Sequence, residues 1–306
     1  MNLGDCLRAA CVILIWGLNF VVIKIGVAGM PPFLFAALRF TLIALPAVFF
    51  IKPPGTKLYL LVFYGMTISF GQFALLFLAI RLGMPAGIAS LVIQSQAFFT
   101  ALLGILLGER LRFYHLLGFS IAGAGMCLVG MGSGGTSDIT ILTMLLTLLA
   151  ALCWGLGNLA NKLIMLDKRS PVNGLSLVVW SSLVPIVPFY LCSYIFEGKD
   201  VIINSIANIH VSAFLALLYL VYISSYIGFT FWSDLLSRHE SWRVAPLTLV
   251  VPVIGLASSA FFLHETITHQ QVIGAIIVFA GLFLNMFGGR FMSALSPVRF
   301  FWGQKK

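Results

Sequence analysis

Ten apolar stretches of about 20 residues follow one another along the chain, separated by short polar gaps. At about 1.5 Å per residue, a helix of that length crosses the roughly 30 Å hydrocarbon core of a bilayer. Only 9% of residues are charged, whereas soluble domains carry about 25%. The stretches are also too long and too continuously apolar for barrel strands. The pattern therefore predicts an all-α, multi-pass membrane protein.

The gaps define ten expected spans and two halves. No gap is long enough to hold a soluble domain, and the Gly/Ser-rich stretch 130–137 separates five spans from the next five. We therefore expect one five-helix unit in residues 1–134 and a second in residues 135–306, which ends in a short basic tail. The expected spans are 6–27, 32–51, 58–80, 86–107, 114–132, 139–162, 174–195, 209–233, 244–263 and 271–289.

Basic residues lie mainly on one side of the expected membrane. With the N-terminus inside, 14 of the 18 Lys and Arg residues fall in cytoplasmic gaps and tails, whereas only Arg81 and Lys199 fall outside. Such a bias over short loops predicts that both termini are cytoplasmic. It also accounts for the net charge of +9, because anionic lipid headgroups are sufficient partners for charges strung along one membrane face. A nucleic-acid partner is not expected, because its binding needs basic residues gathered on one folded surface.

A segment of the first half recurs in the second. WGLNFVVIK, from Trp16 to Lys24, matches WGLGNLANK, from Trp154 to Lys162, with Trp-Gly-Leu and a Lys eight residues after the Trp in both. Because each half has an odd number of spans, the second half must lie inverted in the membrane. Inverted repeats are a transporter architecture, so we expect alternating access; an inert duplicated scaffold is the alternative. Glu109, Gly118 and Gly125 have counterparts in Glu265, Gly274 and Gly281.

Polar side chains interrupt five of the spans, where lipid offers them no hydrogen bonds. Each one alone could bond to a neighbouring helix, but together they predict a hydrated central cavity. Gln94 and Gln96 are two positions apart and point in different directions on a helix, so we expect one to face the cavity and the other to bridge helices. The polar residues are Asn19, Gln72, Gln94, Gln96, Asn158, Asn161, Tyr222 and Tyr226.

Two cations, Lys24 and Arg39, lie within the first two spans, whereas every acidic residue lies at or beyond a span end. A membrane-embedded cation without a carboxylate seeks carbonyls, water or an anionic ligand. We therefore expect Arg39 to meet a negative group of the substrate, such as a carboxylate. The alternative is a structural bond from Arg39 to carbonyls near Gly17 or Pro46. Lys24 and its repeat counterpart Lys162 are candidates for a charge or coupling role, although Lys24 could instead extend to the membrane surface.

A structural role is expected for Glu109 and Glu265. Each precedes the last span of its half, where a carboxylate favours the positive end of the helix dipole. The glycines of these two spans permit close helix packing, within the fold or across a homodimer. They are Gly118, Gly125, Gly274 and Gly281.

The chain lacks the usual signatures of enzymes. It has no HExxH, GxSxG or P-loop pattern, and its five cysteines show no metal spacing. Gly155-x-Gly157-x-x-Ala160 matches a dinucleotide fingerprint but lies inside an apolar stretch without a strand or acidic partner, so we interpret it as accidental. We expect no enzymatic activity, no cofactor and no metal.

The duplicated ten-span pattern resembles the drug/metabolite transporter superfamily, and more closely the EamA-type exporters of O-acetylserine and cysteine. The most specific stretches are WGLNFVVIK, GMPAGIASLVIQSQAFFT (Gly83 to Thr100) and SWRVAPLTLVVPVIGLASS (Ser241 to Ser259). The resemblance implies an inner-membrane exporter of small zwitterions with a central cavity, and spans five and ten at its periphery. Candidate substrate contacts are then Asn19, Gln72, Gln94, Gln96, Asn158 and Asn161, with Trp16 and Trp154 as walls or gates.

Two other functions stay open. Sister families export a broader range of drugs or aromatic amino acids, and a membrane scaffold or enzyme belongs to a different class altogether. A lipophilic cation is disfavoured as substrate because its site usually supplies a membrane-embedded acid, which these spans lack. Competition between labelled cysteine, O-acetylserine and a drug cation would separate the first two functions.

Overall fold

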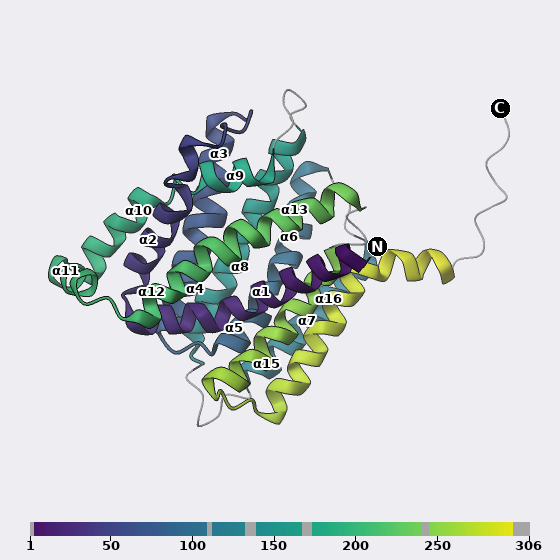
Figure 1. Ribbon diagram of the computed structural model, residues 1–306. Coiled ribbons are helices and arrows are strands. Elements are labelled where there is room, and N and C mark those ends of the chain that lie inside the picture. Colours follow the sequence, from purple (N-terminus) through teal and green to yellow (C-terminus); the bar gives the residue numbers. More distant parts are fainter. Residues whose placement is uncertain (1–2, 109–111, 132–138, 167–172, 240–244, 296–306) are drawn as a thin grey trace.

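The computed structural model describes residues 3–108, 112–131, 139–166, 173–239 and 245–295. These residues form a bundle of helices without strands, which confirms the predicted all-α class (Figure 1). In the first half the helices are α1 (Leu3–Gly29), α2 (Pro32–Ala44), η1 (Ala47–Phe49), α3 (Leu58–Tyr64), η2 (Gly65–Gly71), α4 (Gln72–Arg81), α5 (Ala86–Val92), η3 (Ile93–Ser95), α6 (Gln96–Gly104), η4 (Ile105–Leu107) and α7 (Phe113–Met131).

The second half continues with the same kind of helices. They are α8 (Ile141–Leu166), α9 (Gly174–Ser181), α10 (Ile186–Cys192), η5 (Ser193–Glu197), α11 (Lys199–Ala207), α12 (Val211–Leu218), η6 (Tyr219–Ile227), α13 (Gly228–Arg238), η7 (Ala245–Val250), α15 (Val251–Leu263) and α16 (His269–Leu295). The division between residues 134 and 135 falls outside the described residues, as does Glu109.

Seven helical segments of the described chain are long and apolar enough to cross a membrane: Leu3–Gly29, Pro32–Phe49, Leu58–Arg81, Ala86–Gly104, Ile141–Met165, Gly174–Glu197 and Val211–Trp232. Three further apolar helices, Phe113–Val129, Val251–Leu263 and His269–Asn285, are shorter. These lie at the positions of the remaining expected spans, so the count of ten and the sides of the termini stay predictions.

Several spans change helical geometry where polar residues enter them. A 3-10 turn at η3 contains Gln94 and Ser95, and a π-helical segment at η6 contains Ser224 and Ser225. Such local departures from α-helix rotate the following side chains and are frequent at functional sites. The apolar pattern in the sequence gives no sign of them, because it depends on length and hydropathy rather than on helical register.

The glycines of α7 and α16 bring these two helices into close contact within the chain. A Cβ added to Gly118 would lie 2.8 Å from the Gly281 carbonyl oxygen, and one added to Gly125 would lie 2.7 Å from that of Gly274. Figure 1 shows α7 and α16 side by side at one edge of the bundle. Glycine at these positions is therefore required by the fold itself.

Candidate functional site

Polar side chains join the two halves through the interior. Apart from Arg81, which donates to the carbonyls of Val27 and Ala28, the side-chain hydrogen bonds between distant described segments cross from one half to the other. At α1, Asn19 Nδ2 donates to Ser224 Oγ at 2.8 Å, and Trp16 Nε1 donates to the Ser224 carbonyl oxygen at 3.4 Å. Both contacts tie α1 to η6.

A second network ties η3 and α6 to the other half. Asn158 Nδ2 donates to Gln96 Oε1 at 2.8 Å and to Thr100 Oγ1 at 3.0 Å. Gln94 Nε2 donates to the Thr248 carbonyl oxygen at 3.2 Å. Both glutamines therefore bridge the halves; Gln94 is buried, whereas Gln96 is partly exposed, and the expectation that one of them faces a cavity stays a prediction. The helix α8 packs against η3 and α6, and Gln94 reaches η7 through Thr248.

The remaining amide and tyrosine candidates have different surroundings. Gln72 is buried in α4, and Asn161 keeps a buried Oδ1 that meets no hydrogen-bond partner within the described part of the chain. Tyr226 OH donates to the Ile43 carbonyl oxygen at 2.6 Å, so it also joins the halves. Tyr222, in contrast, is 48% exposed, which places it away from the packed interior.

Trp16, Trp154 and Lys162 lie on the same helices as the residues of the two hydrogen-bond networks. Trp16 packs against Phe229 and Trp232, with ring centroids 5.4 Å apart in both pairs. Trp154 is partly buried against the main apolar core. Lys162 follows Asn158 by one turn of α8. Trp16 thus lines the interface between α1 and α13, as a wall residue would.

Arg39, unlike the residues of the two networks, forms no hydrogen bond with the described chain through its buried side chain. Its side chain lies in α2, is only 4% exposed, and keeps Nε and Nη1 buried without a hydrogen-bond partner among the described residues. The guanidinium carbon lies 4.2 Å from the centroid of the Phe73 ring and 5.4 Å from that of Phe40. The alternative of a bond to nearby backbone carbonyls is wrong, since no such bond joins Arg39 to the described chain.

The two phenylalanine rings beside this guanidinium belong to an aromatic cluster that extends into the second half. Phe40 of α2 stacks on Phe189 of α10 with centroids 5.6 Å apart and ring planes 10° apart. Phe73 contacts Phe40 at 5.5 Å, and Phe70 contacts Phe189 at 4.9 Å, both edge to face. Arg39 therefore lies in an aromatic cluster at the boundary between the halves.

Glu265 closes one end of the boundary. Its Oε1 accepts from Lys24 Nζ at 2.7 Å and from the Ala86 N–H at 2.8 Å, and its Oε2 accepts from the Gly87 N–H at 3.1 Å. The carboxylate thus caps α5 of the first half, rather than the helix that follows it in the chain. Lys24 consequently has a carboxylate partner, and the description of it as a cation without one is wrong.

Glu197 caps the N-terminal end of α2 in the same way. It was not identified from the sequence as a functional or structural candidate. Its Oε1 accepts from the Phe33 N–H at 2.7 Å, and its Oε2 accepts from the Leu34 N–H at 3.1 Å and from Ser193 Oγ at 2.7 Å. The available signal was the proline that precedes each capped helix. Pro31 and Pro85 are N-cap residues without a capping side chain, so the first N–H groups need an acceptor from elsewhere.

An ionic cluster closes the opposite end of α1. Asp5 Oδ1 accepts from Arg8 Nη1 at 3.1 Å, and Asp5 Oδ2 lies 2.9 Å from His239 Nε2. Arg8 Nη1 also lies 3.4 Å from Asp234 Oδ2. Asp234 in turn accepts from Arg238 at 2.8 Å. The cluster joins α1 to the end of α13, so the halves are tied at both ends.

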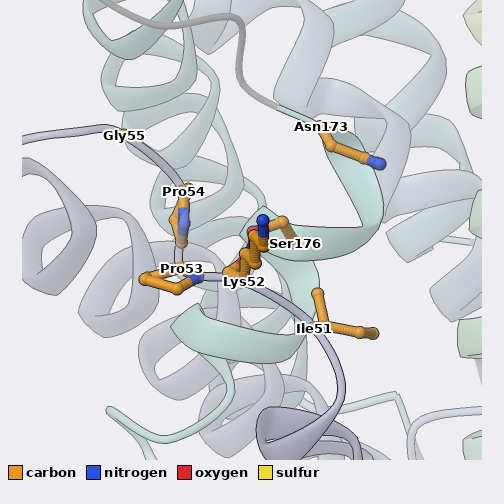
Figure 2. Close-up of a pocket in the computed structure, with 7 residues that line it drawn as sticks. All are labelled: Ile51, Lys52, Pro53, Pro54, Gly55, Asn173 and Ser176. Carbon is orange, nitrogen blue, oxygen red and sulfur yellow. Dashed lines mark hydrogen bonds between the residues drawn. The ribbon is translucent and has the colours of Figure 1, made fainter.

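Two pockets of the described residues lie away from the expected substrate contacts. Figure 2 shows the first, of about 200 Å³, where the chain between η1 and α3 passes the start of α9; it is lined by Ile51, Lys52, Pro53, Pro54, Gly55, Asn173 and Ser176. The second, of about 320 Å³, is lined by Met30, Leu38, Thr41, Leu42, Ile206, Ile209, Phe214 and Leu217. Within the polar networks, Asn19, Gln96 and Asn158 are only partly buried, and the expected hydrated cavity stays a prediction.

Comparison with known proteins agrees with this architecture. The chain is 50% identical over 291 residues to a "Probable amino-acid metabolite efflux pump" of Salmonella typhimurium, covering 95% of this chain and 97% of the relative. A protein of the same description from Escherichia coli K12 is 47% identical over 296 residues, covering 96% and 99%. One solved structure, described only as a crystal structure of a protein, shares the fold with a TM-score of 0.64 and 21% identity, covering 95% of this chain and 99% of that one.

A sequence profile described as the EamA-like transporter family matches the chain twice, at residues 3–131 and 141–287. The two matches separate near the expected division between the halves. The chain belongs to the EamA-like transporter family.

Proposed function

We propose that this protein exports small amino-acid metabolites, cysteine and O-acetylserine among them, across the bacterial inner membrane. The family and the efflux-pump relatives support a metabolite exporter. We further propose that the inverted halves open alternately toward the two sides, with both termini in the cytoplasm, so that the end of α1 at Lys24 faces outward.

One observation supports this mechanism above all others: the polar bonds at membrane depth run between the halves. Asn19 bonds to Ser224, and Asn158 bonds to Gln96. Separating the halves at one end would release these groups together, and a buried amide without a partner is costly. A zwitterionic substrate can replace the lost partners, because its ammonium donates and its carboxylate accepts hydrogen bonds. In this mechanism Gln72, Gln94 and Asn161 complete the contacts to the substrate.

A specific observation favours a second candidate, the export of aromatic amino acids. The rings of Phe40, Phe73 and Phe189 form an apolar wall beside Arg39. Such a wall would bury an aromatic or apolar side chain better than the short polar side chain of O-acetylserine.

The test is uptake of labelled cysteine into everted membrane vesicles, with unlabelled O-acetylserine, phenylalanine and a lipophilic cation as competitors. Preferential competition by O-acetylserine supports the first function, and preferential competition by phenylalanine supports the second. Competition by the cation alone contradicts both.

The matched variants for this assay are the pair Gln96→Leu with Asn158→Leu and, as a control, Asn204→Leu on the exposed face of α11. We expect the pair to abolish uptake and the control to retain it. Full uptake by the folded pair variant would contradict a role of the amide network in transport.

A further inference from the structure

Arg39 is a buried charge that the protein leaves without a counter-charge. The side chain is 4% exposed, and Nε and Nη1 have no hydrogen-bond partner in the described chain. A guanidinium stays charged at any physiological pH. Membrane proteins pair such groups with an acid, with carbonyls, with water or with a ligand. Among the described residues no acid and no carbonyl bonds to Arg39, and Nε and Nη1 are closed to solvent in this conformation. A ligand that enters when the boundary opens is the partner that remains.

The other intramembrane cation provides a comparison within the same chain. Lys24 is 34% exposed at its side chain and still has the Glu265 carboxylate 2.7 Å away. Arg39 is far more buried and has none. The fold thus supplies an acid to the cation that needs it less, a pattern that is explained if the acid for Arg39 arrives with the substrate.

The aromatic neighbours leave the hydrogen-bonding edge of Arg39 available. A cation over a ring is attracted through the face of the aromatic system, and here Phe73 lies 4.2 Å from the guanidinium carbon. The N–H groups of a guanidinium point outward in its plane and match the two oxygens of a carboxylate. Phe73 and a carboxylate can therefore bind the same guanidinium without competing for the same atoms.

The position of Arg39 also suits a site that opens with the halves. Phe40, the next residue in α2, stacks on Phe189 of α10 in the other half. Moving α10 away from α2 would separate Phe189 from Phe40 and open the boundary next to Arg39. Arg39 is thus enclosed when the halves are closed and would be reached from the boundary when they part.

We propose that Arg39 is the binding site for the carboxylate of the exported amino acid. This inference rests on the proposed function and sharpens it, since it requires a free carboxylate in every substrate. An amino-acid amide or ester, or the decarboxylated amine, would leave Arg39 unpaired and bind poorly.

The test measures binding to the purified protein in detergent, by ligand-induced thermal stabilisation and by equilibrium binding. The ligands are O-acetylserine and cysteine against cysteine carboxamide, cysteine methyl ester and cysteamine. For the natural chain we expect affinity for cysteine to exceed that for its amide by more than about tenfold, because a charge-assisted bidentate pair is lost.

The variant Arg39→Gln should bind cysteine and its carboxamide equally, whereas Arg39→Lys should retain part of the preference as a single-point cation. Arg81→Gln, which removes an arginine bonded to backbone carbonyls at the end of α1, is the matched control and should retain the full preference. A folded Arg39→Gln protein that still prefers the carboxylate overturns the proposal.

Two further outcomes are decisive where Arg39→Gln does not fold. Equal stabilisation of the natural protein by cysteine and by cysteine carboxamide overturns the site without any variant. If vesicle uptake shows no amino-acid transport, the proposed function fails separately, and phenylalanine and acetate then serve as carboxylate probes. Stabilisation by these probes, and not by phenylalaninamide or acetamide, supports the carboxylate site; no difference overturns it.

Discussion

Glu197 and Glu265 are bound almost identically but connect different numbers of segments. Each comes from the second half and accepts two successive N–H groups of a helix in the first half that follows a proline. The third partner differs. Glu197 accepts from Ser193 of its own helical segment, whereas Glu265 accepts from Lys24 of α1. Glu265 therefore joins three segments, and Glu197 joins two.

The comparison shows how helix capping can close a boundary between halves. The first N–H groups of a helix need acceptors, and a carboxylate there is also favoured by the helix dipole. Because Pro31 and Pro85 provide no side-chain cap, α2 and α5 depend on the other half for theirs. Opening this end would uncap both helices, and at Glu265 it would also break an ion pair. We therefore expect Glu265 to restrain opening more than Glu197 does.

Among the variants at this boundary, Glu265→Gln is expected to increase opening of the Glu265 end the most. The variant loses the ion pair and weakens one of two N–H contacts, together about 2 kcal/mol, which corresponds to roughly thirtyfold in an equilibrium. The measurement is the rate at which a membrane-impermeant maleimide labels a cysteine at the buried Ser90 position, in a background whose five native cysteines are replaced. Glu197→Gln is the matched variant and should accelerate labelling less. An equal or larger effect of Glu197→Gln would break the comparison.

A smaller effect is expected for Lys24→Met, because the Lys24 side chain is 34% exposed and solvent screens its ion pair. With about 1 kcal/mol lost, labelling at position 90 should rise about fivefold. Ser193→Ala removes the corresponding third partner of Glu197 and should change labelling less than Lys24→Met does. If the two variants behave alike, the ion pair adds nothing to the closure of this end.

Asp5→Asn is expected to change opening of the Glu265 end the least. Asp5 belongs to the ionic cluster with Arg8 and His239 at the opposite end of α1. Its replacement should leave labelling at position 90 within about twofold, because the ion pairs of Asp5 lie at the opposite end of α1 and act locally. Labelling that changes as strongly as with Glu265→Gln would mean that the two ends are coupled.

Much of the helical architecture could be predicted from hydropathy and repetition. The stretch from Trp16 to Lys24 lies within one long helix, as expected from its apolar neighbours. The glycines at positions 118 and 274, matched through the repeat, do allow close helix packing. These features depend on residues near in sequence or on simple steric size, so they can be read without knowing the partners.

The sequence did not predict which residues the polar side chains bond to. Glu197 contacts α2 across more than 160 positions of the chain, and Gln96 meets Asn158 across 62. Tyr222 and Tyr226 occupy one span with one turn between them, yet one is 48% exposed and the other bonds to Ile43. Hydropathy does not distinguish such cases, because the π-helical segment η6 alters which side of the helix each residue occupies.

The amino-acid sequence by itself determined that the chain forms apolar helices arranged as a duplicated transporter, because hydrophobic length and internal repetition are properties of the chain alone. Tertiary structure decided which polar groups are satisfied: the amides find one another, Lys24 finds Glu265, and Arg39 finds no hydrogen-bond partner in the described chain. The physical reason is that burial makes every polar group need a partner, while only the packing of distant helices determines whether one lies within reach.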